Sequence, residues 1–446
     1  MRRLRLFGFF LVFTLLCVSP ASRASTFTSA IKEYTLKNGL KVLVIEDHKA
    51  PLATFQIWYR VGSVNEPAGK TGMSHLLEHM MFKGTHKYGS KQFSNIIQRN
   101  GGTDNAFTTK EYTMYFQTLS ADRINLSIEM EADRMANLLL DPKELESEKN
   151  VVMEERRMRY EDDPQNALYE DVVAAAFKEH PYHWPVIGWM SDIASIGRNT
   201  LYQYYRSYYS PDNAFIVISG DVDPEAVIAK VKEEFGSIAP VSNRTAIKPD
   251  EPVQKGERRV SLKKEAELPY LIVSYHTPSF PHEDNYALDV LSTILSDGRS
   301  SRLYRSIVYG KRLALNAAAD YSGFYRTPFL FSFSATAAPG KHIEDVEKAI
   351  YDEIDGIKKD PPSEKEVQRA KNQIESAFVF AQDSNYSKAL YAGMFEIMGG
   401  WRLMDTYLEG IRKVTPADVQ AVAKKYLKEE NKTVGILIPQ RPGGGK

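Results

Sequence analysis

The order of hydrophobic and polar residues along the chain predicts alternating strands and helices. Residues 33–47 alternate apolar and polar positions around Asn38-Gly39, a pattern typical of a β-hairpin. Further extended segments are expected at 53–61, at about 104–118, and at 214–222, where the run AFIVISGDV has the composition of a buried strand. Helical patterns cover 73–82, about 121–140 and 142 to about 159, and Asp223-Pro224 supplies a cap and first residue for another helix.

The periodicity stops between residues 238 and 256, where three prolines lie among polar residues. Such a stretch is typical of a linker. We therefore predict an N-terminal domain over 25–240, a linker over 241–256 and a C-terminal domain over 257–446, after a signal segment at 1–24.

The two predicted domains share an internal repeat. With a shift of 218 positions, six residues over one helix-turn-strand unit fall on similar residues: Ile193, Ile196, Leu201, Tyr208, Asn213 and Ile218 on Ile411, Val414, Val419, Tyr426, Asn431 and Ile436. With a shift of 216, Tyr59 and Ser63 fall on Tyr275 and Ser279. Helix-turn-strand units often look alike, but one register held without a gap favours duplication. The prediction is an α+β protein with two related halves.

Composition narrows the classes of function. The 446 residues include 43% hydrophobic and 26% charged side chains, as in a globular protein. Lys plus Arg and Asp plus Glu balance at 57 each, so no nucleic acid partner is expected. Cys17 is the only cysteine, and it lies in the predicted signal segment. Any metal in the mature protein must therefore be held by His, Asp or Glu.

The N-terminus has the pattern of a secretory signal peptide. Arg2, Arg3 and Arg5 precede an apolar run over 6–18, and small residues at Ser22 and Ala24 favour cleavage before residue 25. A retained membrane anchor is the alternative, but the run of about 13 residues is shorter than the roughly 20 that span a bilayer. A lipid on Cys17 is disfavoured by the large Leu16 before it. We expect a periplasmic or secreted protein.

The helix predicted at 73–82 carries the sequence His75-x-x-Glu78-His79. Residues four apart lie on one helix face, about 6 Å from each other, so both imidazoles can bind one tetrahedral zinc ion. Glu78 can accept a proton from a zinc-bound water, and this inverted spacing is a zinc-peptidase pattern. A chance cluster on a solvated helix is the alternative, but the apolar flanks Leu76, Leu77 and 80–82 predict a buried helix.

A catalytic zinc needs a third protein ligand. In the helix that follows residue 142, Glu148 and Glu155 share a stripe with Leu145 and Val152. One carboxylate is expected to bind the metal and the other to orient a ligand. Glu154 remains an alternative on periodicity alone, and so does an ordinary charged surface helix.

Four motifs resemble the pitrilysin and insulin-degrading peptidase family, in particular its short members similar to mitochondrial processing peptidase. They are GMSHLLEHMMFKGT at 72–85, NGGTDNAFT at 100–108, EKNVVMEE at 148–155 and SSRLY at 300–304. The resemblance covers about residues 31–440. It implies that each half is a mostly antiparallel sheet flanked by helices.

The resemblance also implies roles for individual residues. His75, His79 and Glu155 match the family's zinc ligands, Glu78 matches its general base and Glu148 its supporting acidic residue. Asn105, Ala106 and Phe107 match the edge strand to which an extended substrate adds. The implied activity is that of a zinc metalloendopeptidase acting on extended or unfolded polypeptides.

One departure from the family pattern concerns an Arg and a Tyr, seven apart, that stabilise the oxyanion and hold the substrate carbonyl in active subunits. Val308 and Leu315 stand at these positions. The resemblance therefore predicts a related second subunit that supplies the pair, in a heterodimer, with a homodimer as another arrangement. A register shift that brings in Arg305, Tyr309, Lys311 or Arg312 is the alternative.

Two other classes of function compete with the peptidase. One is a structural or non-catalytic subunit that keeps the metal ligands, and the other is a peptide-binding or chaperone-like module that uses the edge strand without cleavage. The presence of Glu78 argues against a structural site, which has no use for a base beside an open coordination position.

Overall fold

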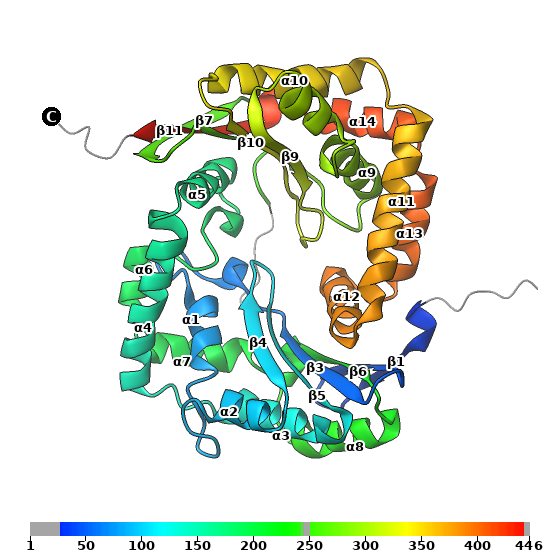
Figure 1. Cartoon of the computed structure of the whole chain (residues 1–446). Coiled ribbons are helices and arrows are strands. Elements are labelled where there is room, and N and C mark those ends of the chain that lie inside the picture. Colours follow the sequence, from blue (N-terminus) through cyan, green and yellow to red (C-terminus); the bar gives the residue numbers. More distant parts are fainter. Residues whose placement is uncertain (1–26, 242–243, 245–249, 441–446) are drawn as a thin grey trace, which may run out of the picture.

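The computed structural model of the protein describes residues 27–241, 244 and 250–440 (Figure 1). The signal segment expected at 1–24 lies outside the described residues, and so does part of the linker expected at 241–256. The predicted domain boundaries therefore stay a prediction. No helix in the described part of the chain combines the length and the apolar character needed to cross a bilayer.

The N-terminal half is built on a six-stranded sheet. Its order is β1 (Ile31–Thr35), β2 (Lys41–Glu46), β6 (Ala214–Gly220), β3 (Leu52–Tyr59), β5 (Thr113–Ser120) and β4 (Thr103–Thr108). Only β2 and β6 pair in parallel. The helices of this half are α1 (Met73–Met80), α2 (Gln92–Arg99), α3 (Ile124–Asn137), α4 (Pro142–Arg156), α5 (Pro164–Ala176), α6 (Met190–Ser195), α7 (Arg198–Tyr208) and α8 (Pro224–Phe235).

The C-terminal half is built on a five-stranded sheet. Its order is β7 (Arg258–Glu265), β11 (Lys432–Gln440), β8 (Tyr270–Thr277), β10 (Phe329–Ala337) and β9 (Ala314–Tyr321), and only β7 and β11 pair in parallel. Its helices are α9 (Asn285–Ser296), α10 (Ile343–Lys359), α11 (Glu364–Phe380), α12 (Asn385–Met398), α13 (Leu403–Lys413) and α14 (Pro416–Tyr426).

The two halves repeat one topology, which confirms the predicted α+β fold with two related sheets. In each half the last strand pairs in parallel with one neighbour and antiparallel with the other. A pair of equivalent asparagines repeats even the side-chain contacts. Asn213 Nδ2 donates to the carbonyls of Tyr208 and Arg60, and Asn431 Nδ2 donates to those of Tyr426 and His276.

Successive residues of a strand point to opposite faces of the sheet. In the central strands β2, β3, β6, β8 and β10 nearly all residues are buried, so both faces of each sheet are covered there. In the N-terminal sheet, Val42, Val44, Phe55 and Ile57 lie in the core formed with this half's own helices, such as α3 and α8. The alternate residues of these strands lie in a second core that includes α12.

The halves exchange helices, as Figure 1 shows. Helix α5 of the N-terminal half packs against β7, β8 and β11, and α12 of the C-terminal half packs against β3 and β6. Each contact is close enough to need a glycine. A Cβ on Gly435 would lie 2.2 Å from Cγ2 of Val172, and one on Gly393 would lie 2.3 Å from the ring of Trp58.

Candidate metal centre

Helix α1 is anchored at its N-terminus by a buried carboxylate. Glu66 accepts hydrogen bonds from the backbone N–H groups of Gly72, at 2.7 Å, and Ser74, at 2.6 Å. A helix N-terminus favours such an anion, although burial raises the pKa of Glu66 to about 8. Gly72 has φ of +92°, and a Cβ there would lie 2.5 Å from the carbonyl oxygen of Ile187. The backbone at the start of α1 therefore requires glycine at position 72, and this close contact fixes the direction of the helix.

Helix α4 begins as its sequence predicts. Asp141 caps it by accepting from the N–H groups of Lys143 and Glu144, and Pro142 occupies the first turn. Leu145 and Val152 are fully buried against the rest of this half. The same stripe of α4 carries the two glutamates predicted for the metal site, so the packing of α4 on α1 brings them to the histidines.

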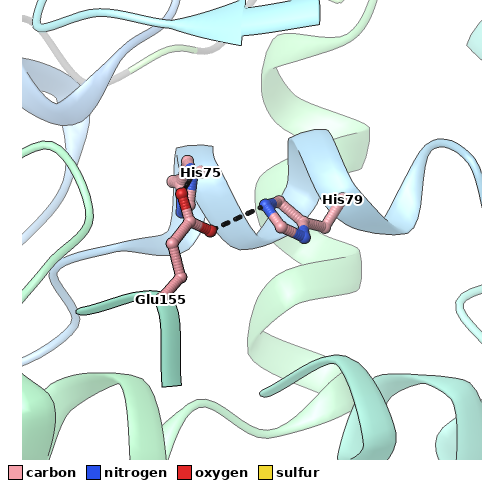
Figure 2. A group of neighbouring side chains, drawn as sticks. All are labelled: His75, His79 and Glu155. Carbon is pink, nitrogen blue, oxygen red and sulfur yellow. Dashed lines mark ion pairs between the residues drawn. The ribbon is translucent and has the colours of Figure 1, made fainter. Parts of the chain in front are cut away.

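Three side chains converge between these two helices. Figure 2 shows Glu155 of α4 beside His75 and His79 of α1. The Nε2 atom of His79 lies 3.4 Å from Oε2 of Glu155, and Nε2 of His75 lies 3.7 Å from Oε1 of the same carboxylate. One ligand atom from each residue lies within 4.8 Å of the other two.

This arrangement fits a zinc ion. Two atoms bonded at 2.0–2.1 Å to one tetrahedral ion lie about 3.4 Å apart, close to the 3.4 Å and 3.7 Å between the histidine nitrogens and the Glu155 oxygens. Two imidazoles and one carboxylate are also the donor set of many catalytic zinc sites, which leaves a fourth position for water or substrate. His75, His79 and Glu155 would hold the ion.

The two histidines differ in their electrostatic surroundings. Burial lowers the pKa of His75 to about 4, with a further contribution from the neighbouring His79. For His79, burial opposes protonation, but the contacts with Glu148 and Glu155 outweigh it and raise the pKa to about 9. A proton on His79 thus takes the place that a metal cation would fill, and the two must compete.

Glu148 orients His79 from the side away from the other ligands. Its Oε1 lies 2.9 Å from Nδ1 of His79, and its second oxygen forms an ion pair with Lys83. A carboxylate on the second ring nitrogen fixes the tautomer and direction of a metal-binding histidine. The position of Glu148 therefore matches a supporting role rather than a ligand role.

Glu78 lies beside the ligands without occupying either imidazole's place. Its Oε2 accepts a hydrogen bond of 2.5 Å from the hydroxyl of Thr108, the last residue of β4. Burial raises the pKa of Glu78, and the hydrogen bond from Thr108 opposes that rise. A half-buried carboxylate of this kind is suited to accept a proton.

Strand β4 forms one edge of the N-terminal sheet, and among the described strands it pairs only with β5. The predicted substrate residues Asn105, Ala106 and Phe107 lie in this strand, opposite Phe116, Tyr115 and Met114. Their strand contacts α1, so the free edge runs beside the metal helix.

The structure decides between the two adjacent glutamates of α4. The side chain of Glu154 is 65% exposed and pairs with Arg157, whereas that of Glu155 is 20% exposed and faces the histidines. Of the two, Glu155 is the one that lies beside the histidines. The expectation of one extended segment over 104–118 is wrong, because residues 109–112 form a turn between β4 and β5.

Comparisons with known proteins identify the family. Residues 41–188 match the family model described as insulinase (peptidase family M16), and residues 195–374 match the one described as peptidase M16 inactive domain. The zinc protease PqqE of Helicobacter pylori is 31% identical over 429 residues, which cover 95% of this chain and 96% of that protein. The chain belongs to the M16 peptidase family. The resemblance noted in the sequence is confirmed.

Further similarities place this M16 peptidase among zinc metallopeptidases. The uncharacterized zinc protease YmxG of Bacillus subtilis is 29% identical over 402 residues, which cover 90% of this chain and 96% of that protein. The crystal structure of a protease from Helicobacter pylori superposes with a TM-score of 0.89 at 31% identity, over 92% of this chain and 99% of the other. The names of PqqE and YmxG imply zinc as the metal.

Several residues around the M16 site were not singled out from the sequence. Lys83 lies one turn after His79, and Arg159 lies one turn after Glu155, 2.9 Å from its Oε1. Because residues four apart in a helix lie on one face, this spacing could have indicated both contacts from the sequence. Glu66 and Thr108 reach α1 from other elements, and nothing in the local pattern indicates these contacts.

Proposed function

We propose that this chain is a zinc endopeptidase that hydrolyses peptide bonds in extended or unfolded polypeptides. The observation that supports it most strongly is the convergence of His75, His79 and Glu155 beside the carboxylate of Glu78, next to a free strand edge. Three ligands, a base and a place for an extended chain are the parts that this reaction needs.

A zinc ion held by His75, His79 and Glu155 would supply a Lewis acid, which makes water more acidic and a carbonyl more electrophilic. Glu78 accepts the proton of the attacking water and returns it to the leaving amine. Its raised pKa suits both steps, because a group that accepts and then donates a proton works best near the working pH. Glu148 holds the His79 ring in place throughout.

The substrate is proposed to add to β4 as a further strand. Backbone hydrogen bonds to residues 105–107 would bind any extended segment with little demand on its sequence. The polypeptide then passes α1 and Glu78, which contact the same strand. This mode of binding does not depend on a chain terminus and therefore favours an endopeptidase.

A related subunit is proposed to complete the site. Val308 and Leu315 carry no hydrogen-bond donor in their side chains, and Leu315 is exposed on the edge strand β9. Lys311 is one of the polar neighbours that could replace them. Its Nζ lies 3.7 Å from Oδ2 of Asp352, so it already has an acidic partner. A partner of the same family that carries an Arg and a Tyr would supply the missing donors for the oxyanion.

We further propose that the protein works outside the cytoplasm, in the periplasm or after secretion. The support is the basic and apolar character of the first 24 residues.

The test of the proposed function compares the wild-type chain with Glu78→Gln, alone and together with a candidate partner subunit. Zinc content and cleavage of an unfolded peptide are measured. Glu78→Gln is expected to keep zinc and to lower kcat by about 10²- to 10⁴-fold, the usual contribution of a general base. A matched control is Glu154→Gln, which removes an exposed carboxylate next to a ligand and should change neither quantity.

Three outcomes would contradict the proposal. The wild-type chain could bind no zinc, it could bind zinc and peptide without cleavage in every combination, or Glu78→Gln could cleave as fast as the wild type. Binding without cleavage would indicate the peptide-binding module, and full activity of the single chain would exclude the need for a second subunit.

A further inference from the structure

Thr108 connects the strand edge to the carboxylate of Glu78. It is the last residue of β4, and its hydroxyl donates to Oε2 of Glu78 at 2.5 Å. A hydrogen bond to a charged acceptor at this distance is among the strong ones in proteins. Among the residues that the structure describes, Thr108 is the only hydrogen-bond donor to the Glu78 side chain.

The surroundings commit the Thr108 hydroxyl to this role. Its cross-strand partner Thr113 lies 3.4 Å away, Oγ1 to Oγ1, but the Thr113 hydroxyl donates to the carbonyl of Val61 at 2.9 Å. Each hydroxyl has a single hydrogen. The hydrogen of Thr108 is therefore directed to Glu78, and that of Thr113 into the sheet.

We propose that Thr108 is a positioning residue for Glu78, an inference that rests on the proposed function. Its hydroxyl holds Oε2 and thereby leaves Oε1 to exchange the proton with water and the leaving amine. Without this bond, the glutamate side chain can turn about its terminal torsion, which has a broad energy profile. A base that spends less time in the productive orientation reacts more slowly.

The position of Thr108 in the strand adds a second consequence. Residues 105–107, the proposed partners of the substrate, directly precede it in β4. The same strand would thus bind the polypeptide and hold the base. The positions of the scissile bond and of the Glu78 carboxylate would then both be set by β4. A displacement of the strand would move both together.

The test uses two substitutions of Thr108 with different chemistry. Thr108→Val keeps the branched shape that suits a strand but has no hydroxyl, whereas Thr108→Ser keeps the hydroxyl. In the zinc-loaded protein, with its partner subunit if one is required, Thr108→Val is expected to lower kcat by about 10- to 100-fold with KM changed less than about two-fold. Thr108→Ser is expected to stay within about three-fold of the wild type.

The matched control is Thr54→Val. Thr54 is a buried threonine of β3 whose hydroxyl bonds to that of Thr118 in the same sheet. This variant measures how the loss of a buried strand hydroxyl affects stability and zinc content, and it should leave kcat unchanged. An unchanged kcat in Thr108→Val, an equal loss in Thr108→Ser, or a loss explained by missing zinc would overturn the proposal.

Crystal structures of the zinc-loaded variants test the positioning role without any assay of activity. Thr108→Val is expected to show Glu78 in more than one orientation, and Thr108→Ser in one. A single unchanged orientation in Thr108→Val would overturn the positioning role even if the protein is an active peptidase. Conversely, absence of cleavage by the wild type would defeat the proposed function while this structural comparison still decides about Thr108.

Discussion

His79 and Glu78 at the metal site are each held by a second residue. Glu148 contacts His79, Thr108 contacts Glu78, and Glu66 fixes the N-terminus of the helix that carries them. A site that depends on orientation should therefore be sensitive to residues that never touch the metal.

The Glu148→Gln substitution tests this dependence. The amide keeps the size of the side chain but loses the charge that holds the His79 ring and Lys83. Affinity for zinc is expected to fall by about 10- to 100-fold, measured by competition with a chelator of known affinity. Glu146→Gln, an exposed position on the same helix, is the control and should bind zinc as the wild type does.

The sequence could predict part of the site because that part is local. The spacing of His75 and His79 on one helix indicates a shared ion, and the stripe of α4 selects Glu148 and Glu155 as candidates. Periodicity could not exclude Glu154, because this residue shares a helix face with the apolar Val151 and Met158. In the structure Glu155 lies beside the histidines, and Glu154 pairs with Arg157. Thr108 could not be predicted, because its contact depends on the end of a strand meeting a helix from another part of the chain.

Helices and strands form where the sequence predicts them when the pattern of apolar and polar residues spans the whole element. The hairpin around Asn38-Gly39, the buried strand β6 and the start of α4 at Pro142 are confirmed. The end of α4 is less regular than its pattern, because the helix continues as a π-helical turn over 157–161. The turn at 109–112 escaped prediction because β4 and β5 together have the composition of a single extended segment.

At the level of elements, the contact between α12 and β3 can be tested with Gly393→Ala. The added Cβ would lie 2.3 Å from the buried ring of Trp58, so helix and sheet must separate. The free energy of unfolding is expected to fall by about 1–3 kcal/mol, as for other overpacked cores. It is measured by denaturant titration.

The control for this substitution is Gly356→Ala in α10. Nothing lies within 4 Å of a Cβ at that position. Alanine there should raise stability by about 0.5–1 kcal/mol, because glycine is the poorer helix residue. Equal effects of the two substitutions would contradict the role of close packing at Gly393.

On the scale of the whole molecule, the two halves also meet at a buried histidine. His180 accepts from the N–H of Tyr182 through Nδ1, and its Nε2 lies 3.2 Å from the hydroxyl of Thr327 in the C-terminal half. Burial lowers the pKa of His180 to about 4. Protonation of this ring would therefore oppose the association of the halves.

The predicted consequence is a loss of stability in acid. Between pH 6.5 and about 4 the unfolded chain binds a proton at His180 that the folded protein does not, so the free energy of unfolding falls as the pH falls. In the presence of chelator, the free energy of unfolding of His180→Asn should fall less over this pH range than that of the wild type. The difference is expected to be on the order of 1–3 kcal/mol. His86→Asn, at an exposed position, should follow the wild type.

The exchange of α5 and α12 has a consequence for the integrity of the molecule. The chain passes from one half to the other between α8 and β7, yet each half also covers the other's sheet with a helix. A protease that nicks the backbone within residues 241–256 would therefore leave a two-piece molecule that stays assembled. For the same reason, two separately synthesised fragments should recover the native structure only when they are mixed.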